Sequence, residues 1–231
     1  MITTLLPRLN SDLGELADLV RKSLVQVAAG RNGAGSGVVF SADGLVVTNA
    51  HVVSARAGSA RGAPERRRRH PAREFQVTLP SGSVTAAKLL AKDDDLDVAV
   101  LRIDQINGSL PELYPIELGD SKALRPGQWV MAMGHPWGVA GAAAGGIVIG
   151  AGPDLPEAPG AGREWVVTDL ALRPGHSGGP LVDHRGRLIG MSTMMAGLEV
   201  GMAVPAHVIE EFVTSVLGRG SELGGHDTAL A

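Results

Sequence analysis

Short apolar runs separated by turn residues dominate the hydrophobic pattern of this chain. The runs are rich in valine, leucine and isoleucine, and glycine, proline and aspartate gather between them, which is typical of antiparallel β-proteins. The glycine-rich stretch 30–37 is predicted to be a loop. Two successive sets of strands are expected. The first set covers 24–27, 38–40, 45–48, 75–79, 83–90 and 98–101, and the second covers 128–133, 146–150, 164–169, 180–182, 187–192 and 201–204.

Two segments near the ends of the chain carry a helical pattern instead. An apolar stripe at helical spacing follows Ser11, which can cap a helix. A second stripe lies close to the carboxyl end, where Gly218 can stop it. We therefore expect a short helix at 11–23, a second helix at 206–217 and a flexible tail at 218–231.

The composition indicates a globular protein without a general attraction to nucleic acid or anionic membranes. Apolar residues make up 44% and charged residues 19% of the 231 positions, and the formal net charge is −3. The basic run Arg66–Arg69 is typical of a solvated loop, so no nucleic-acid partner is expected. Cysteine is absent and the seven histidines lack ligand spacing with carboxylates, so neither a metal nor another cofactor is expected.

The first part of the chain also bears on its compartment. Residues 1–30 carry charged and polar groups at short intervals, without an uninterrupted apolar stretch. Neither a signal peptide nor a membrane span is therefore predicted, and the expected compartment is the cytoplasm. A periplasmic or extracellular location is the alternative if the N-terminus was trimmed.

The densest cluster of turn residues, at 173–180, holds a single hydroxyl, that of Ser177. Glycine and proline let the backbone turn sharply, so a serine there can present its Oγ while neighbouring N–H groups converge on an oxyanion. A plain turn between strands is the alternative. The pattern Gly175-x-Ser177-x-Gly179 also matches the nucleophile elbow of α/β-hydrolases, but that elbow must lead into a helix, and the residues that follow favour a strand.

Two more residues have the chemistry that a serine nucleophile needs. His51 follows a predicted strand, and Asp97 precedes a wholly apolar one, where a carboxylate must be hydrogen-bonded. Each alone could be structural, as a core histidine or a turn-capping aspartate. Together, the order His51, Asp97, Ser177 is that of chymotrypsin-type catalytic triads.

Short sequence blocks spread over residues 20–217 resemble serine proteases of the chymotrypsin clan, most closely the high-temperature-requirement (HtrA/Deg) branch. The matching blocks are Gly35-Ser36-Gly37-Val38-Val39, Val47-Thr48-Asn49-Ala50-His51-Val52-Val53, Asp97-Val98-Ala99-Val100-Leu101, Met133-Gly134-His135-Pro136-Trp137-Gly138, Gly175-His176-Ser177-Gly178-Gly179-Pro180 and Ala203-Val204-Pro205. The resemblance implies an all-β fold of two six-stranded antiparallel β-barrels, with the active site in the cleft between them. We expect a trypsin-like protease domain over 1–217, with its first barrel at about 24–112 and its second at about 118–205.

The resemblance also implies the role of each site residue. Ser177 would be the nucleophile, His51 the general base and Asp97 the group that orients His51. The backbone N–H groups of Gly175 and Ser177 would form the oxyanion hole. His176 stands where such proteases usually have asparagine, and its side chain is expected to point to solvent rather than compete for a hydrogen bond with Ser177.

The primary specificity pocket implied by the resemblance contains no charged side chain. We therefore expect cleavage after small or medium aliphatic residues and not after lysine or arginine. The residues expected to line the pocket are Ala171, Leu172, Gly190, Met191, Ser192 and Thr193.

The predicted function is that of a serine endopeptidase that hydrolyses unfolded or damaged polypeptides through an acyl-enzyme intermediate. Trimers are common in the resembled family, so a homo-oligomer is expected. Fourteen residues follow position 217, too few for the PDZ domain usual after such proteases, so a lone or truncated protease module is expected.

Two alternatives come from other classes of protein. A binding or chaperone-like protein would keep the protease fold but hold the loop at 173–175 in an inactive shape. An α/β-hydrolase esterase would need a catalytic histidine after Ser177, for which His184, His207 and His226 are the candidates.

Overall fold

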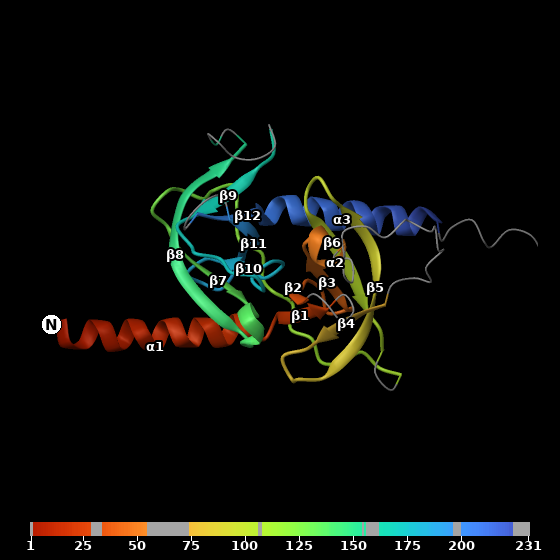
Figure 1. Ribbon diagram of the computed structural model, residues 1–231, viewed down its shortest axis with the longest axis horizontal. Helices are drawn as coiled ribbons and strands as arrows, with labels where there is room; N and C mark the ends of the chain where they lie inside the picture. The colour runs from red at the N-terminus through yellow and green to blue at the C-terminus, as the bar shows by residue number, and fades with distance from the viewer. Residues whose placement is uncertain are drawn as a thin grey trace, which may run out of the picture.

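The computed structural model describes residues 2–28, 34–54, 74–105, 108–153, 155, 162–195 and 200–223. The basic run at 66–69 and His226 lie outside these ranges. Within them, twelve strands form two closed antiparallel barrels of six strands each, and the barrels lie side by side (Figure 1). The predicted all-β fold of two six-stranded barrels is confirmed, whereas the exact domain limits stay a prediction.

The first barrel closes in the order β1-β2-β3-β6-β5-β4. Apart from β2, its strands follow the predicted apolar runs closely, because each run supplies one apolar face to a packed interior. The strands are β1 (Leu24–Ala28), β2 (Ala34–Val39), β3 (Leu45–Thr48), β4 (Glu74–Thr78), β5 (Val84–Asp93) and β6 (Val98–Ile103).

The second barrel closes in the order β10-β11-β12-β9-β8-β7. A short 3₁₀ turn, η2 (Pro136–Gly138), separates β7 from β8. The strands are β7 (Trp129–Gly134), β8 (Ala142–Gly152), β9 (Trp165–Thr168), β10 (Pro180–Val182), β11 (Leu188–Met195) and β12 (Gly201–Pro205).

Within the described part of the chain, three apolar cores hold the fold together. One fills the first barrel and another fills the second, and a third lies between the barrels and the helices. Alternate residues of one strand serve different cores: Val46 of β3 belongs to the first-barrel core, while Leu45 and Val47 belong to the shared one. Each fully buried side chain of this size contributes about 1.5–3 kcal/mol, so the shared core joins the barrels strongly.

The stretch 30–37 was predicted to be a loop, but β2 already begins at Ala34. The glycines there provide close packing instead of a turn. A Cβ on Gly37 would lie 2.9 Å from side-chain atoms of Val27 and Val46, and one on Gly35 would lie 2.7 Å from Val52. The loop prediction is wrong for residues 34–37, because glycine serves both loops and close packing and the local sequence does not separate the two, while residues 30–33 lie outside the described ranges.

α1 (Ile2–Arg21) is longer than the short helix predicted at 11–23. Ser11 lies inside the helix rather than at its start, and its hydroxyl donates to Glu15 Oε1 one turn later, at 3.3 Å. The apolar stripe continues upstream to exposed leucines such as Leu5. The outer half of the helix extends away from the barrels (Figure 1).

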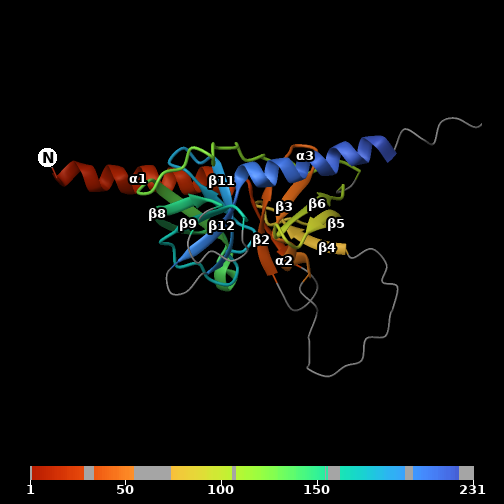
Figure 2. The ribbon, with the colours of Figure 1, turned by 90° about the horizontal axis from the view of Figure 1, so that it is seen from above.

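α3 (Ala206–Leu223) also exceeds its predicted end at 217, so the first residues of the predicted tail are helical. Gly218 does not adopt the positive φ of a helix-ending glycine, which is why the helix continues through it. α3 packs on β11 and β12 of the second barrel and on β6 of the first (Figure 2). No helix in the described ranges is long and apolar enough to cross a membrane.

Candidate active site

The pairing of β3 with β6 places His51 next to Asp97. Thr48 at the end of β3 lies opposite Ala99 near the start of β6. α2 (Ala50–Ser54) begins one residue beyond the end of β3, after Asn49, and Asp97 directly precedes β6. Two residues 46 positions apart in the sequence are therefore brought together at one end of a strand pair.

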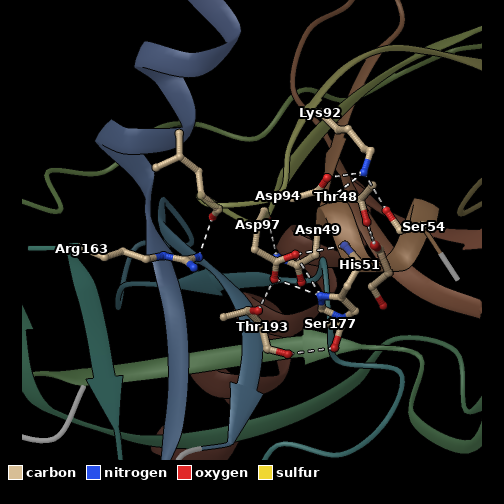
Figure 3. Close-up of polar contacts among 12 residues, drawn as sticks. Thr48, Asn49, His51, Ser54, Lys92, Asp94, Asp97, Arg163, Ser177 and Thr193 are labelled. Carbon is tan, nitrogen blue, oxygen red and sulfur yellow. Dashed lines mark hydrogen bonds and ion pairs between the residues drawn. The ribbon is translucent and has the colours of Figure 1, made fainter. Parts of the chain in front are cut away.

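Asp97 accepts several hydrogen bonds in a buried position. Nδ1 of His51 lies 2.9 Å from its Oδ2 and 3.0 Å from its Oδ1, and the backbone N–H of His51 donates to Oδ1 at 3.0 Å (Figure 3). The Thr193 hydroxyl donates a further, short hydrogen bond to Oδ2. The backbone of Asp97 has a φ of 54°, uncommon for a residue with a side chain, and its carbonyl accepts from Asn49 Nδ2 at 3.0 Å.

These contacts determine the protonation of the pair. Burial disfavours the ionised carboxyl of Asp97, but the hydrogen bonds from His51 and Thr193 outweigh burial and hold its pKa below the ordinary value of 3.8. Asp97 is therefore ionised at neutral pH and can only accept hydrogen bonds. Consequently Nδ1 of His51 carries a proton, and Nε2 is left free to act as a base.

Ser177 lies in the glycine-rich turn that leads into β10. Its Oγ donates to the backbone carbonyl of Thr193 at 2.9 Å (Figure 3). Among the described residues, no hydrogen bond joins this hydroxyl to His51. Thr193 therefore connects the two halves of the site, because its hydroxyl bonds Asp97 and its carbonyl bonds Ser177.

The two glycines after Ser177 have no room for a side chain. A Cβ on Gly178, whose φ is 82°, would lie 2.0 Å from the carbonyl oxygen of Ser36. A Cβ on Gly179 would lie 2.0 Å from the carbonyl oxygen of Met133. The turn can therefore enter the space between the barrels only as glycine.

The backbone around Ser177 leaves two N–H groups available. Within the described ranges, the N–H groups of Gly175 and Ser177 have no hydrogen-bond acceptor, whereas that of His176 donates to the carbonyl of Arg173 at 2.9 Å. Gly175 has a φ of 106°, which a residue with a side chain rarely adopts. The two free N–H groups belong to the residues predicted to form the oxyanion hole.

The side chain of His176 is buried, contrary to the expectation that it points to solvent. It has 4% of its surface exposed, and its Nδ1 accepts from the backbone N–H of Arg173 at 3.0 Å. Burial lowers its pKa below the ordinary value of 6.5. The turn at 173–176 closes around the ring, a contact that the neighbouring residue types do not reveal.

The residues predicted to line a specificity pocket lie along β11 and in the segment before the serine turn. Leu172, Ser192 and Thr193 are buried, and Ala171 is half-buried. Met191 has no exposed surface and packs into the shared core, so contact with a substrate would require it to move. The pocket assignment stays a prediction.

Two contacts around Asp97 could not be predicted from the sequence. Thr193 was expected to contact substrate, and its bond to Asp97 was not foreseen. Arg163 donates to the carbonyl of Leu96 at 2.6 Å while its guanidinium stacks 3.8 Å from the ring centre of Trp165. Both contacts cross between the barrels, and no local sequence signal marks them.

The structure does not support the α/β-hydrolase alternative. The serine turn leads into the short strand β10 and not into a helix, so the nucleophile-elbow interpretation is wrong. His207 is engaged elsewhere: its Nδ1 lies 2.7 Å from Ser121 Oγ and its Nε2 lies 3.0 Å from Glu164 Oε2. Among the described residues, no group of three or more histidine, aspartate or glutamate side chains could hold a metal ion.

Comparison with known proteins establishes the family. Residues 35–191 match the trypsin-like peptidase domain, and the chain therefore belongs to that family. The solved structure of the HtrA-type protease AlgW with a tripeptide superposes with a TM-score of 0.72 at 29% sequence identity, covering 90% of this chain and 64% of that one.

Sequence relatives come from the HtrA branch, as the resemblance predicted. The chain is 33% identical over 192 residues to the putative serine protease HhoB of Synechocystis sp. and 38% identical over 181 residues to the mitochondrial serine protease HTRA2 of Bos taurus. A probable periplasmic DegP-like serine endoprotease of Brucella suis is 35% identical over 192 residues. The matches cover 81%, 78% and 81% of this chain but only 41%, 35% and 33% of those relatives.

Proposed function

We propose that this chain is a serine endopeptidase whose triad is His51, Asp97 and Ser177. The observation that carries the proposal is the hydrogen bonding of His51 Nδ1 to both carboxylate oxygens of Asp97, which leaves Nε2 basic. Membership of the trypsin-like peptidase family and relatives named as serine proteases support it.

In this mechanism the Ser177 hydroxyl leaves the Thr193 carbonyl and turns to Nε2 of His51. Nε2 takes the proton as Oγ attacks the substrate carbonyl carbon, and Asp97 stabilises the imidazolium that forms. The negative charge on the substrate oxygen is received by the N–H groups of Gly175 and Ser177, where one lost donor would cost about 100- to 1,000-fold in rate. His51 then protonates the leaving amine, and water hydrolyses the acyl-enzyme with His51 again as the base.

The proposed substrates are unfolded or damaged polypeptides cut after small or medium aliphatic residues. The uncharged residues predicted for the specificity pocket support this preference, because no carboxylate among them would attract lysine or arginine. A peptide library sampling every residue at the cleaved position tests the proposal. Preferred cleavage after lysine or arginine would contradict it.

Assembly and compartment are also proposed from the family. We infer a homotrimer, which sedimentation velocity of the purified chain at several concentrations tests directly. The cytoplasm is the location expected from the sequence, while relatives named as periplasmic support the periplasm instead. Fractionation of cells that make the natural full-length protein separates these locations.

The proposed activity is tested with a fluorophosphonate probe and with casein. We expect one covalent adduct per chain, on Ser177, together with casein cleavage, and we expect Ser177→Ala and His51→Ala to abolish both. Circular dichroism of all three proteins controls for folding. A folded parent chain that forms no adduct would favour the binding-protein alternative, for which the present bond between Ser177 and Thr193 is the supporting observation.

A further inference from the structure

Ser36 of β2, a fully buried residue of the first barrel, holds the carbonyl groups of both proposed oxyanion residues. Its backbone N–H donates to the carbonyl of Ser177 at 2.7 Å, and its Oγ donates to the carbonyl of Gly175 at 2.8 Å. These two carbonyls belong to the residues whose N–H groups are available for an oxyanion. One residue of the opposite barrel thus contacts the serine turn at both positions that matter for the hole, with its side chain at Gly175 and its backbone at Ser177.

His135, which directly follows β7 in the second barrel, completes this contact. Its backbone N–H donates to the Gly175 carbonyl at 3.0 Å and lies 3.1 Å from Ser36 Oγ. Its ring Nδ1 lies 2.9 Å from the same Oγ. Since the single hydroxyl proton of Ser36 is given to Gly175, Nδ1 of His135 must carry a proton and donate to Ser36.

The result is a serine turn with one fixed peptide group on each side of the Ser177 N–H, the first of which also directly follows the Gly175 N–H. The Gly175–His176 peptide is held by Ser36 and His135 at its carbonyl and by the Arg173 carbonyl at its N–H. The peptide after Ser177 is held by Ser36 at its carbonyl and by the Ser192 carbonyl at its N–H. The Ser177 N–H therefore cannot rotate away without breaking several buried hydrogen bonds, and rotation of the Gly175 N–H is restricted by the fixed peptide that directly follows it.

We propose that Ser36 and His135 are positioning residues that set the oxyanion hole by holding the Gly175 and Ser177 carbonyls. This inference rests on the proposed peptidase function. Because the hole acts on the charge that develops in the transition state, loss of the contact lowers kcat and leaves KM nearly unchanged. The expected fall in kcat is about 10- to 100-fold, since complete loss of one donor costs ~100-fold or more.

The chain offers a matched control for Ser36→Ala, a second buried serine whose hydroxyl also bonds a histidine. Ser121 and His207 form a pair with the same pattern, in which the His207 N–H lies 3.0 Å from Ser121 Oγ and Nδ1 lies 2.7 Å from it. This pair contacts Glu164 and not the serine turn. Ser121→Ala therefore reproduces the loss of a buried hydroxyl without touching the proposed site.

The experiment compares Ser36→Ala, His135→Leu, His135→Asn and Ser121→Ala in peptide hydrolysis. Asparagine carries an amide nitrogen on Cγ, where histidine carries Nδ1, so His135→Asn should restore the donor to Ser36 and keep kcat within about threefold. We expect Ser36→Ala and His135→Leu to lose kcat with KM unchanged, and Ser121→Ala to keep both. An unchanged kcat in Ser36→Ala and His135→Leu, or an equal fall in Ser121→Ala, would overturn the proposal.

Hydrogen exchange provides a readout that does not depend on activity. The proposal expects faster amide exchange over residues 173–179 in Ser36→Ala and His135→Leu, but not in Ser121→Ala. If the parent chain cleaves nothing, the proposed function fails, and this exchange pattern alone still supports the positioning role. Equal exchange in all the proteins overturns it, and His135→Leu provides the test if Ser36→Ala does not fold.

Discussion

The two barrels contribute to the site in different ways. The first barrel holds its half internally, because His51 and Asp97 lie at one end of the paired strands β3 and β6 and bond each other. The second barrel presents Ser177 on a turn held both by its own residues and from outside, through Ser36 of the first barrel. The base is thus formed by sheet pairing within one barrel, whereas the nucleophile and oxyanion hole depend on how the barrels meet. A mutation in one half of the site should therefore leave the hydrogen bonds of the other half intact.

The largest effect is expected from damage to the first-barrel half. In Asp97→Asn an amide NH₂ can donate to Nδ1 of His51, which favours the tautomer with the proton on Nε2 and removes the base. We expect kcat/KM to fall by about 10⁴-fold, as in chymotrypsin-type triads generally. Steady-state hydrolysis of a chromogenic peptide measures the fall, with near-wild-type thermal unfolding as the control. A loss under tenfold would show that Asp97 does not set the tautomer.

A smaller loss should follow from damage confined to the second-barrel half. In Gly175→Ala the new Cβ would lie 2.5 Å from the His135 carbonyl oxygen at a φ of 106°, so the turn must move. We expect kcat to fall by about 100-fold, the cost of losing one oxyanion donor. The low-field NMR signal of the His51 Nδ1 proton should persist. Its disappearance would mean that the two halves are coupled.

Thr193 bonds Asp97 through its hydroxyl and Ser177 through its carbonyl, and a substitution can remove the hydroxyl while it keeps the carbonyl. Thr193→Val keeps the shape but leaves a buried oxygen of Asp97 with one donor fewer, at a cost of about 1–3 kcal/mol in the free energy of unfolding. Because the pKa of Asp97 is lowered in the folded state, this stabilisation is complete above pH 3.8 and is lost as the pH falls through the lower folded value. Urea unfolding at pH 7 measures the cost, and an unchanged midpoint would contradict the assignment.

The smallest effect concerns His176 in the serine turn. Burial lowers its pKa below 6.5, so the unfolded chain binds the proton more readily, and the folded state loses stability as the pH falls from 6.5 through the folded pKa. Because asparagine does not titrate, His176→Asn should show a smaller loss of stability between pH 7.5 and 5.5. Urea midpoints of both proteins at the two pH values measure the difference. Equal losses would mean that His176 titrates as it does in the unfolded chain.

Most strands and the three triad residues could be predicted from local sequence, but contacts between distant segments could not. The strands could be predicted because each apolar run fits one strand, and His51, Asp97 and Ser177 could be singled out because their order and settings match a known triad. The burial of His176, the bond from Thr193 to Asp97 and the strand role of Gly37 could not be predicted. Each depends on a surface supplied by a distant segment, and residue type alone does not indicate which surface will be met.

The apolar core shared by the barrels has a consequence for how the chain unfolds. Valines of β2, β3 and β6, methionines of β7 and residues of α1 and α3 all belong to it, so each barrel has an apolar outer face that only the rest of the fold covers. A barrel produced alone would expose this face to water and tend to aggregate. The two barrels should therefore melt in a single calorimetric transition, with the site persisting until the whole fold is lost.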